Sequence, residues 1–285
     1  MSRRRIFNMV TYLFIYYMGL VPYLMGDVSP TVTAVYRVIA AIACIAAGYF
    51  LGGLNFAIMI SKKKYGVDVR DFGSGNAGMT NMRRTFGKKA GHITLAGDAG
   101  KCFVACILGY ILLGRLGAYI AGFFCVLGHM FPMQYKFKGG KGVVCTAVFV
   151  LMTSAGDPVL LFIPVVFLIC FACFAVIVLG SKYISLGSII SILIYPLILN
   201  TFNEISLAIE IEGTNNLIPY KLFTTAVSNI IAIMTAVFVV FMHRENIKRI
   251  WNRKESKFDF HMSNKKALYQ STPEEENVKD AKTKK

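Results

Sequence analysis

The stretch "LFTTAVSNIIAIMTAVFVVFM", residues 222–242, decides the class of fold. It contains no charged side chain, and a helix of about 20 such residues is long enough to cross the hydrocarbon core of a bilayer. Runs of similar character recur along the chain, at 6–25, 36–60, 93–113, 117–133, 158–180 and 184–202, with a shorter run at 143–154. The pattern predicts an all-α polytopic membrane protein.

The composition supports the same class. Only 16% of the residues are charged and 55% are hydrophobic, whereas about 25% of a soluble domain is charged. The chain carries 31 Lys and Arg against 15 Asp and Glu, a formal net charge of +16. In a membrane protein, such an excess of positive charge is expected in short loops on the cytoplasmic side.

The basic segments predict the orientation of the spans. They are "SKKKYGVDVR" (61–70), "RRTFGKK" (83–89), "YKFKGGK" (135–141), "SKY" (181–183) and "HRENIKRIWNRK" (243–254), together with the arginines at 3–5. All of them fall on one face only if the short run at 143–154 also crosses the membrane. Counting it gives about eight spans, both chain ends in the cytoplasm, and loops poor in basic residues on the outer face.

Three regions are expected along the chain. Residues 1–33 form an N-terminal transmembrane helix and an outer loop, 34–258 form the main membrane domain, and 259–285 form a polar, disordered cytoplasmic tail. The run at 6–25 could instead be a signal peptide, but its apolar core is long and no clear cleavage site precedes Asp27. We therefore interpret it as an anchor helix.

The chain does not carry a metal-binding pattern. Cys170 and Cys173 form a C-x-x-C motif inside an apolar run with no histidine nearby. Metal and redox sites need accessible thiolates, so these cysteines are interpreted as packing residues. No metal site is predicted.

The glycine motif "FGSGNAGMTN", residues 72–81, has G-x-G-x-x-G spacing, and Asp98 follows at the distance of the acidic residue in a dinucleotide-binding fold. That fold requires a buried strand before the glycines, whereas here a polar basic loop precedes them. "YKFKGGKG", residues 135–142, likewise departs from a phosphate-binding P-loop. It has Tyr135 where that loop begins with glycine and Gly142 where it has Ser or Thr. Both assignments are rejected.

The same loops still combine glycines, cations and amides at one membrane boundary. Backbone N–H groups, arginine and lysine are the usual partners of phosphate, so the pattern predicts a site for a phosphorylated solute beside lipid. A transporter or channel for organic phosphates is the alternative that the residues leave open. Transporters usually place their polar site near the midplane, whereas the spans hold few ionisable residues, chiefly Arg37, Asp98 and Lys101. We interpret the last two as a pair near the inner interface.

Four blocks carry a family resemblance: "GSGNAGMTNMRRTFGKKAG" (73–91), "GHMFPMQYKFKGGKGV" (128–143), "SKYISLGS" (181–188) and "HRENIKR" (243–249). They resemble, in the same order over residues 36–258, the conserved loops of the bacterial acyl-phosphate:glycerol-3-phosphate acyltransferase family, the integral membrane PlsY type. The resemblance implies a seven-helix core, to which the run at 6–25 adds one helix, with its active-site loops on the cytoplasmic face of the bacterial cell membrane.

The resemblance also implies the reaction. A fatty acyl group passes from a long-chain acyl phosphate to the sn-1 hydroxyl of glycerol 3-phosphate, giving lysophosphatidic acid and phosphate, the first acylation step of phospholipid synthesis. It implies no cofactor, no metal and no use of acyl-CoA. The expected partners are the two substrates and membrane lipids, and no nucleic acid.

The family motifs transfer residue by residue. The catalytic residues implied are Ser74, Arg84, Lys141, His243 and Asn246. The substrate-binding residues implied are Gly75, Asn76, Gly78, Thr80, Asn81, His129, Lys138, Gly139, Gly140, Gly142, Ser185, Ser188 and Glu245. The sequence departs from the family where Met79 replaces an alanine, and where Val144 and Cys145 replace Ala-Thr, which places Thr146 one position late.

The sequence contains no His-x-x-x-x-Asp dyad to act as a general base. Because an acyl phosphate is already activated, positioning and charge neutralisation can suffice. We expect the catalytic residues to grip the two phosphate groups, and the loop glycines to present N–H groups to the acyl phosphate. The phosphate of glycerol 3-phosphate, with a second pKa of about 6, can take the hydroxyl proton. His243 is the competing base.

Overall fold

The computed structural model describes residues 15, 17–26, 28–155, 164–208 and 218–258, and within them every regular element is helical. The elements are α2 (Leu20–Met25), α3 (Pro30–Gly53), α4 (Phe56–Tyr65), η1 (Val69–Asp71), α5 (Met79–Phe86), α6 (Lys88–Met130), η2 (Met133–Tyr135), α7 (Val143–Ser154), α8 (Val165–Ser181), α9 (Ile184–Ala208), α10 (Ile218–Met242) and α11 (Arg244–Trp251). The predicted all-α class is confirmed.

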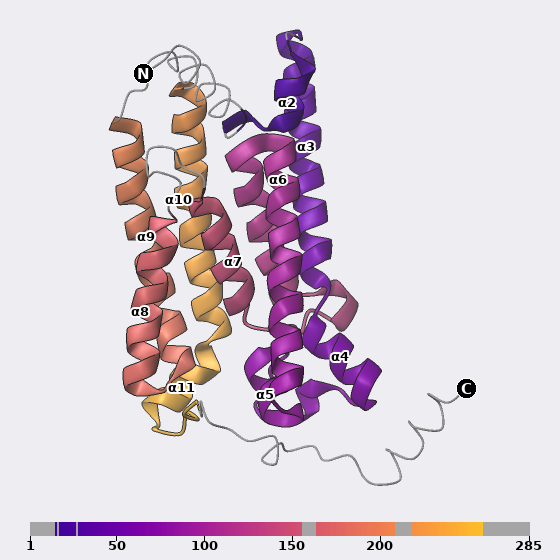
Figure 1. The fold of residues 1–285 in the computed structure, drawn as a ribbon, viewed down its shortest axis with the longest axis vertical. Helices are drawn as coiled ribbons and strands as arrows, with labels where there is room; N and C mark the ends of the chain where they lie inside the picture. The colour runs from indigo at the N-terminus through magenta and orange to yellow at the C-terminus, as the bar shows by residue number, and fades with distance from the viewer. Residues whose placement is uncertain (1–14, 16, 27, 156–163, 209–217, 259–285) are drawn as a thin grey trace, which may run out of the picture.

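The long helices run side by side, with α8, α9 and α10 on one side, α3 and α6 on the other, and α7 between them (Figure 1). The short helices α4, α5 and α11 lie together at one end. We call this the basic end, because it carries the segments 61–70, 83–89 and 243–254. Among the described residues, four segments are long and apolar enough to cross a membrane: Pro30–Tyr65, Lys88–Tyr135, Ile184–Ala208 and Ile218–Met242.

Helix α6 consists of two arms. Leu113 and Gly114 have non-helical backbone angles, and Gly114 adopts φ 59°. The arms, residues 88–112 and 115–130, fold back on each other so closely that a Cβ on Gly109 would lie 2.2 Å from the carbonyl oxygen of Gly117. The separate runs predicted at 93–113 and 117–133 are therefore two helices joined at this turn.

Helix α3 packs on the second arm of α6 through small residues. A Cβ on Gly52 would lie 2.1 Å from the carbonyl oxygen of Cys125, so only glycine allows this approach. Small residues allow such close backbone contact between membrane helices. The run predicted at 36–60 is divided after α3, because Asn55 begins a new helix by accepting a hydrogen bond from the Ile58 N–H at 3.1 Å.

Other sequence predictions are only partly covered. Helix α7 matches the short run at 143–154, but at 1.5 Å per residue it extends about 18 Å, less than the hydrocarbon core of about 30 Å. Its crossing stays a prediction, because 156–163 lie outside the described residues. Half of the predicted helix at 6–25 and the tail at 259–285 also lie outside them.

A buried polar cluster joins the helices at the end opposite the basic end. Arg115 Nη2 donates to Asn203 Oδ1 at 3.0 Å, and Asn203 Nδ2 donates to Ser228 Oγ at 3.1 Å. These contacts tie α6, α9 and α10 together.

Candidate active site

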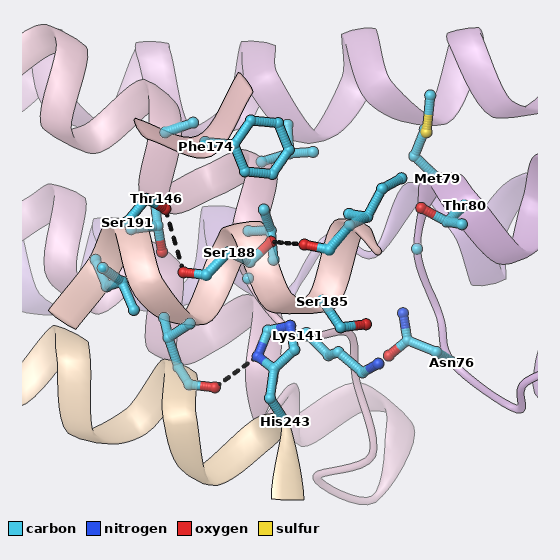
Figure 2. A pocket seen from close by; sticks show the side chains of 18 of the residues that line it. Asn76, Met79, Thr80, Lys141, Thr146, Phe174, Ser185, Ser188, Ser191 and His243 are labelled. Atoms are coloured by element: carbon cyan, nitrogen blue, oxygen red, sulfur yellow. Dashed lines mark hydrogen bonds between the residues drawn. The ribbon is translucent and has the colours of Figure 1, made fainter. Parts of the chain in front are cut away.

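A cavity of about 660 Å³ extends from the basic end into the bundle. Its polar end is lined by Ser74, Asn76, Thr80, Arg84, Lys141, Ser185, His243, Asn246, Arg249 and Glu255. Its apolar end is lined by Val144, Val148, Val150, Phe167, Phe171, Phe174, Ile192 and Tyr195, from α7, α8 and α9. Figure 2 shows Lys141, Ser185, His243 and Asn76 near one another, with Phe174, Thr146 and Ser191 further along the wall.

The first loop, which precedes α5, is held in shape by Asn81. Its Oδ1 accepts from the Ser74 N–H at 3.0 Å, and its Nδ2 donates to the carbonyls of Phe72 at 2.9 Å and Val69 at 3.0 Å. Asn81 touches the cavity, but its polar atoms are used within the loop. It therefore places Ser74 at the polar end.

The second loop corrects one expectation about the glycines. The Gly139 N–H donates to the Met130 carbonyl and the Gly140 N–H to the His129 carbonyl, both at 3.1 Å. In the first loop, the Gly75 and Gly78 N–H groups donate to the carbonyls of Phe72 and Asn76. The N–H groups of these four glycines therefore hold the loops together. This differs from the expectation from the sequence, which was that they point at an anion.

The starts of two helices supply the N–H groups instead. Helix α5 begins after Gly78 and α7 begins after Gly142, and both glycines line the cavity. Gly142 has φ 76°, which favours glycine. The first turn of a helix leaves its N–H groups without partners in the helix and carries partial positive charge. Two such ends at one cavity form a site suited to phosphate.

The third loop joins the second through Lys141 and Asn246. Lys141 Nζ donates to Asn246 Oδ1, and Asn246 Nδ2 donates to Ser185 Oγ at 2.7 Å and to Glu255 Oε1 at 2.6 Å. Glu255 also pairs with Arg249 at 2.8 Å. The carboxylate of Glu255 thus fixes α9, α11 and the segment after α11 around the polar end.

Burial sets the charge state of two site residues. Burial of the ammonium, with Arg249 nearby, lowers the pKa of Lys141 to about 8. Burial, with a smaller contribution from Lys141, lowers the pKa of His243 to about 4. His243 Nδ1 lies 2.7 Å from the Val239 carbonyl, which can only accept, so Nδ1 carries the proton. At neutral pH the ring is therefore neutral, and Nε2 is a hydrogen-bond acceptor.

The structure brings together most of the residues predicted from the sequence. All five catalytic candidates line the cavity, as do eight of the binding candidates: Asn76, Gly78, Thr80, Asn81, His129, Gly142, Ser185 and Ser188. Thr146, one position later than in the family motif, also lines it, and its buried Oγ1 has no hydrogen-bond partner among the described residues. Met79, which stands where the family motif has alanine, is the first residue of α5 and forms part of the cavity wall.

Five predicted binding residues lie outside the cavity wall: Gly75, Lys138, Gly139, Gly140 and Glu245. The Lys138 carbonyl accepts from Arg70 at 2.9 Å and its side chain is exposed. The Glu245 side chain is 57% exposed and pairs with Lys248 at 3.4 Å. The structure therefore does not bring these five residues to the cavity wall, and their contact with substrate stays a prediction.

Sequence reasoning missed several lining residues, chiefly Ser191, Tyr195, Glu255 and Phe258. The helical spacing of Ser185, Ser188 and Ser191 could have indicated the third serine. Nothing in the local sequence marks Glu255 as part of the site. In the described part of the chain, no group of three or more His, Cys, Asp or Glu side chains is placed to hold a metal ion.

Comparison with known proteins links this cavity to a family. Residues 42–253 match the family model described as glycerol-3-phosphate acyltransferase. The chain is similar to the glycerol-3-phosphate acyltransferase of Finegoldia magna, with 37% identity over 226 residues, 78% of this chain and 96% of the relative. It is 34% identical over 213 residues to that of Bacillus subtilis, covering 75% of this chain and 95% of the relative.

The fold also matches solved structures. It is similar to the crystal structure of PlsY, an integral membrane glycerol 3-phosphate acyltransferase, in its glycerol 3-phosphate form. The TM-score is 0.61 at 31% identity, covering 77% of this chain and 96% of PlsY. The lysophosphatidic acid form of PlsY matches with a TM-score of 0.59 at 28% identity, covering 81% of this chain and 99% of PlsY.

Proposed function

The chain belongs to the integral membrane glycerol-3-phosphate acyltransferase family, and we propose that its acyl donor is a long-chain acyl phosphate and its acceptor the sn-1 hydroxyl of glycerol 3-phosphate. The products are then lysophosphatidic acid and inorganic phosphate. We further propose that the basic end faces the cytoplasm of a bacterial cell, because positive loops stay on that side of the membrane.

The observation that carries this proposal is the continuity of the cavity. Its polar end holds the cations Arg84, Lys141 and Arg249, with the carboxylate of Glu255 paired to Arg249, together with two helix starts. Its apolar end runs between α7, α8 and α9. An acyl phosphate combines a dianionic head with an alkyl chain, and so it needs a cavity with both a polar and an apolar end. Glycerol 3-phosphate brings a second phosphate to the same polar end.

The reaction mainly needs the two substrates to be positioned and their developing negative charge to be stabilised. The acceptor hydroxyl oxygen attacks the carbonyl carbon, the bond from that carbon to the bridging oxygen breaks, and phosphate leaves with the electron pair. The cations and helix starts stabilise the charge on the carbonyl oxygen and the leaving phosphate. Ser185 and Asn246 hold Lys141 in place through the contacts described above.

The proton of the hydroxyl passes to the phosphate of glycerol 3-phosphate itself. Its second pKa is about 6, whereas the pKa of His243 is about 4, so the substrate phosphate is the stronger base. The neutral His243 orients the acceptor by accepting a hydrogen bond through Nε2 from the other hydroxyl of glycerol 3-phosphate, so that the proton of the attacking hydroxyl is left for the phosphate. This difference in pKa supports the substrate phosphate, and not His243, as the general base.

The test is phosphate release from palmitoyl phosphate by the purified protein, with and without glycerol 3-phosphate. We expect release that depends on the acceptor, formation of 1-palmitoyl-glycerol 3-phosphate, and no product when palmitoyl-CoA replaces the donor. The variant Lys141→Met should lose at least about 100-fold of kcat/KM, because it removes a charge-assisted bond to phosphate. Equal use of palmitoyl-CoA would overturn the donor assignment.

A further inference from the structure

A buried ionic cluster, two of whose members (Asp98 and His129) line the cavity, has no part in the mechanism above. Lys101 Nζ lies 2.9 Å from Asp98 Oδ1 and 2.9 Å from His129 Nδ1, and His129 Nδ1 lies 3.5 Å from Asp98 Oδ1. The three side chains are only 2%, 2% and 5% exposed. Buried charge pairs often contribute little net stability, so stability alone is a weak reason for this cluster.

Lys101 anchors the cluster to the end of α3. Its Nζ donates to the carbonyls of Gly52 at 2.9 Å and Leu54 at 2.8 Å. The last carbonyls of a helix have no partner within it, and the ammonium supplies one. Since Lys101 is on the first arm of α6 and His129 on the second, a single ammonium fixes His129 against three helices.

The other side of the His129 ring meets the second glycine loop. A Cβ on Gly140 would lie 2.2 Å from His129 Nε2 and 2.5 Å from the carbonyl oxygen of Ala77. Gly140 therefore lies against both the ring and the first loop. The His129 carbonyl also accepts from the Gly140 N–H at 3.1 Å, and Asn55 Nδ2 donates to the Ala77 carbonyl at 3.3 Å.

This contact point sits directly before both helix starts of the polar end. Ala77 precedes Gly78, after which α5 begins, and Gly140 lies just before Gly142, after which α7 begins. Because Gly140 lies against both the ring and the Ala77 carbonyl, a displacement of the ring is expected to shift Gly140 relative to Ala77, and with it the start of α7 relative to that of α5. The ring would then act as a spacer, in the sense that it supports Gly140 at a fixed position against the first loop.

We propose that Asp98 and Lys101 are positioning residues that hold the His129 ring as this spacer, and so set the distance between the two phosphate-binding helix starts. At metal sites, a residue that contacts the histidine ring on the side away from the ligand fixes the orientation of that ring. Removal of such a residue typically lowers affinity or activity by about 10- to 100-fold. The identity of the ligands rests on the proposed function, whereas the spacing of the loops does not.

The test uses the double variant Asp98→Asn/Lys101→Met, which removes both charges so that neither is left unpaired. We expect the KM for glycerol 3-phosphate, for palmitoyl phosphate or for both to rise about 10- to 100-fold. The matched control is Asn203→Ala, which breaks the buried cluster at the opposite end of the bundle. It should lower the Tm and Vmax while both KM values stay within about 3-fold of the wild type.

A purely structural role predicts a different result. Loss of folded protein lowers Vmax but leaves KM unchanged, so unchanged KM values in the double variant would overturn the proposal. If the double variant does not fold, Asp98→Asn alone, which keeps the shape of the side chain, is judged by the same KM criterion with an expected rise of about 5-fold.

A readout without turnover separates this proposal from the proposed function. The concentration of inorganic phosphate needed for the same fixed increase in Tm should rise about 10-fold in the double variant and stay unchanged in Asn203→Ala. That shift would support the spacer even if the wild type used another acyl donor. Equal phosphate concentrations for all three proteins would contradict it.

Discussion

The pKa of Lys141 leads to a quantitative prediction about pH. Burial and the nearby Arg249 lower this pKa to about 8 in the free protein, and only the protonated ammonium attracts phosphate. The value of kcat/KM reports ionisations of the free enzyme. At pH 9, one unit above the pKa, about a tenth of the lysine is protonated. The wild-type kcat/KM for glycerol 3-phosphate should therefore fall to about a tenth of its plateau.

The substitution Lys141→Arg removes this fall, because arginine stays charged throughout the range. The variant can be less active overall, since arginine does not reproduce the geometry of lysine, but its profile should be flat from pH 7 to 9.5. The assay is release of phosphate that depends on the acceptor, measured at each pH with the acceptor-free rate subtracted. Retention of the wild-type alkaline fall in Lys141→Arg would refute the assignment of that fall to Lys141.

Four further results are expected. His243→Gln should lower kcat but keep an acidic limb near pH 6, set by the substrate phosphate; a limb that moves would make the histidine the base. Tyr195→Ala should shift the preferred donor to a longer acyl chain, because this ring forms part of the wall of the apolar end; an unchanged preference would mean that the ring does not close the cavity. Gly52→Ala should lower the free energy of unfolding by about 1–3 kcal/mol by overpacking. The control Gly100→Ala should not, because a Cβ there meets nothing within 4 Å, and equal melting temperatures for the two variants would contradict the close packing at Gly52. Lys138→Met should keep kcat/KM within about 2-fold and the wild-type pH profile, because this side chain is exposed; a large loss would return it to the site.

The helices could be predicted from the sequence where the apolar signal is long and uninterrupted. The runs at 93–113, 117–133, 184–202 and 222–242 all correspond to helices. The run at 36–60 was harder, because α3 ends at Gly53 and Asn55 caps the next helix within the same run. A single polar residue in an apolar run gives little signal, and only its hydrogen bond to the Ile58 N–H shows the break.

The site could be predicted in kind but not in detail. Residues in the motifs predicted to bind phosphate, such as Ser74, Arg84 and Lys141, do meet at one cavity. The sequence could not show that the N–H groups of Gly139 and Gly140 bond to the end of α6, because that depends on tertiary contact. For the same reason Glu255, in a polar segment after α11, gave no indication that it reaches Ser185 and Asn246.

The most direct test of acyl transfer is the fate of the bridging oxygen of the donor. Palmitoyl phosphate labelled with ¹⁸O between carbon and phosphorus is reacted with glycerol 3-phosphate in a single turnover, and both products are analysed by mass spectrometry. Attack on the carbonyl carbon predicts that the label appears in inorganic phosphate and is absent from lysophosphatidic acid. Label retained in palmitate or in the lipid product would mean that the phosphorus–oxygen bond breaks, and would contradict acyl transfer at this cavity.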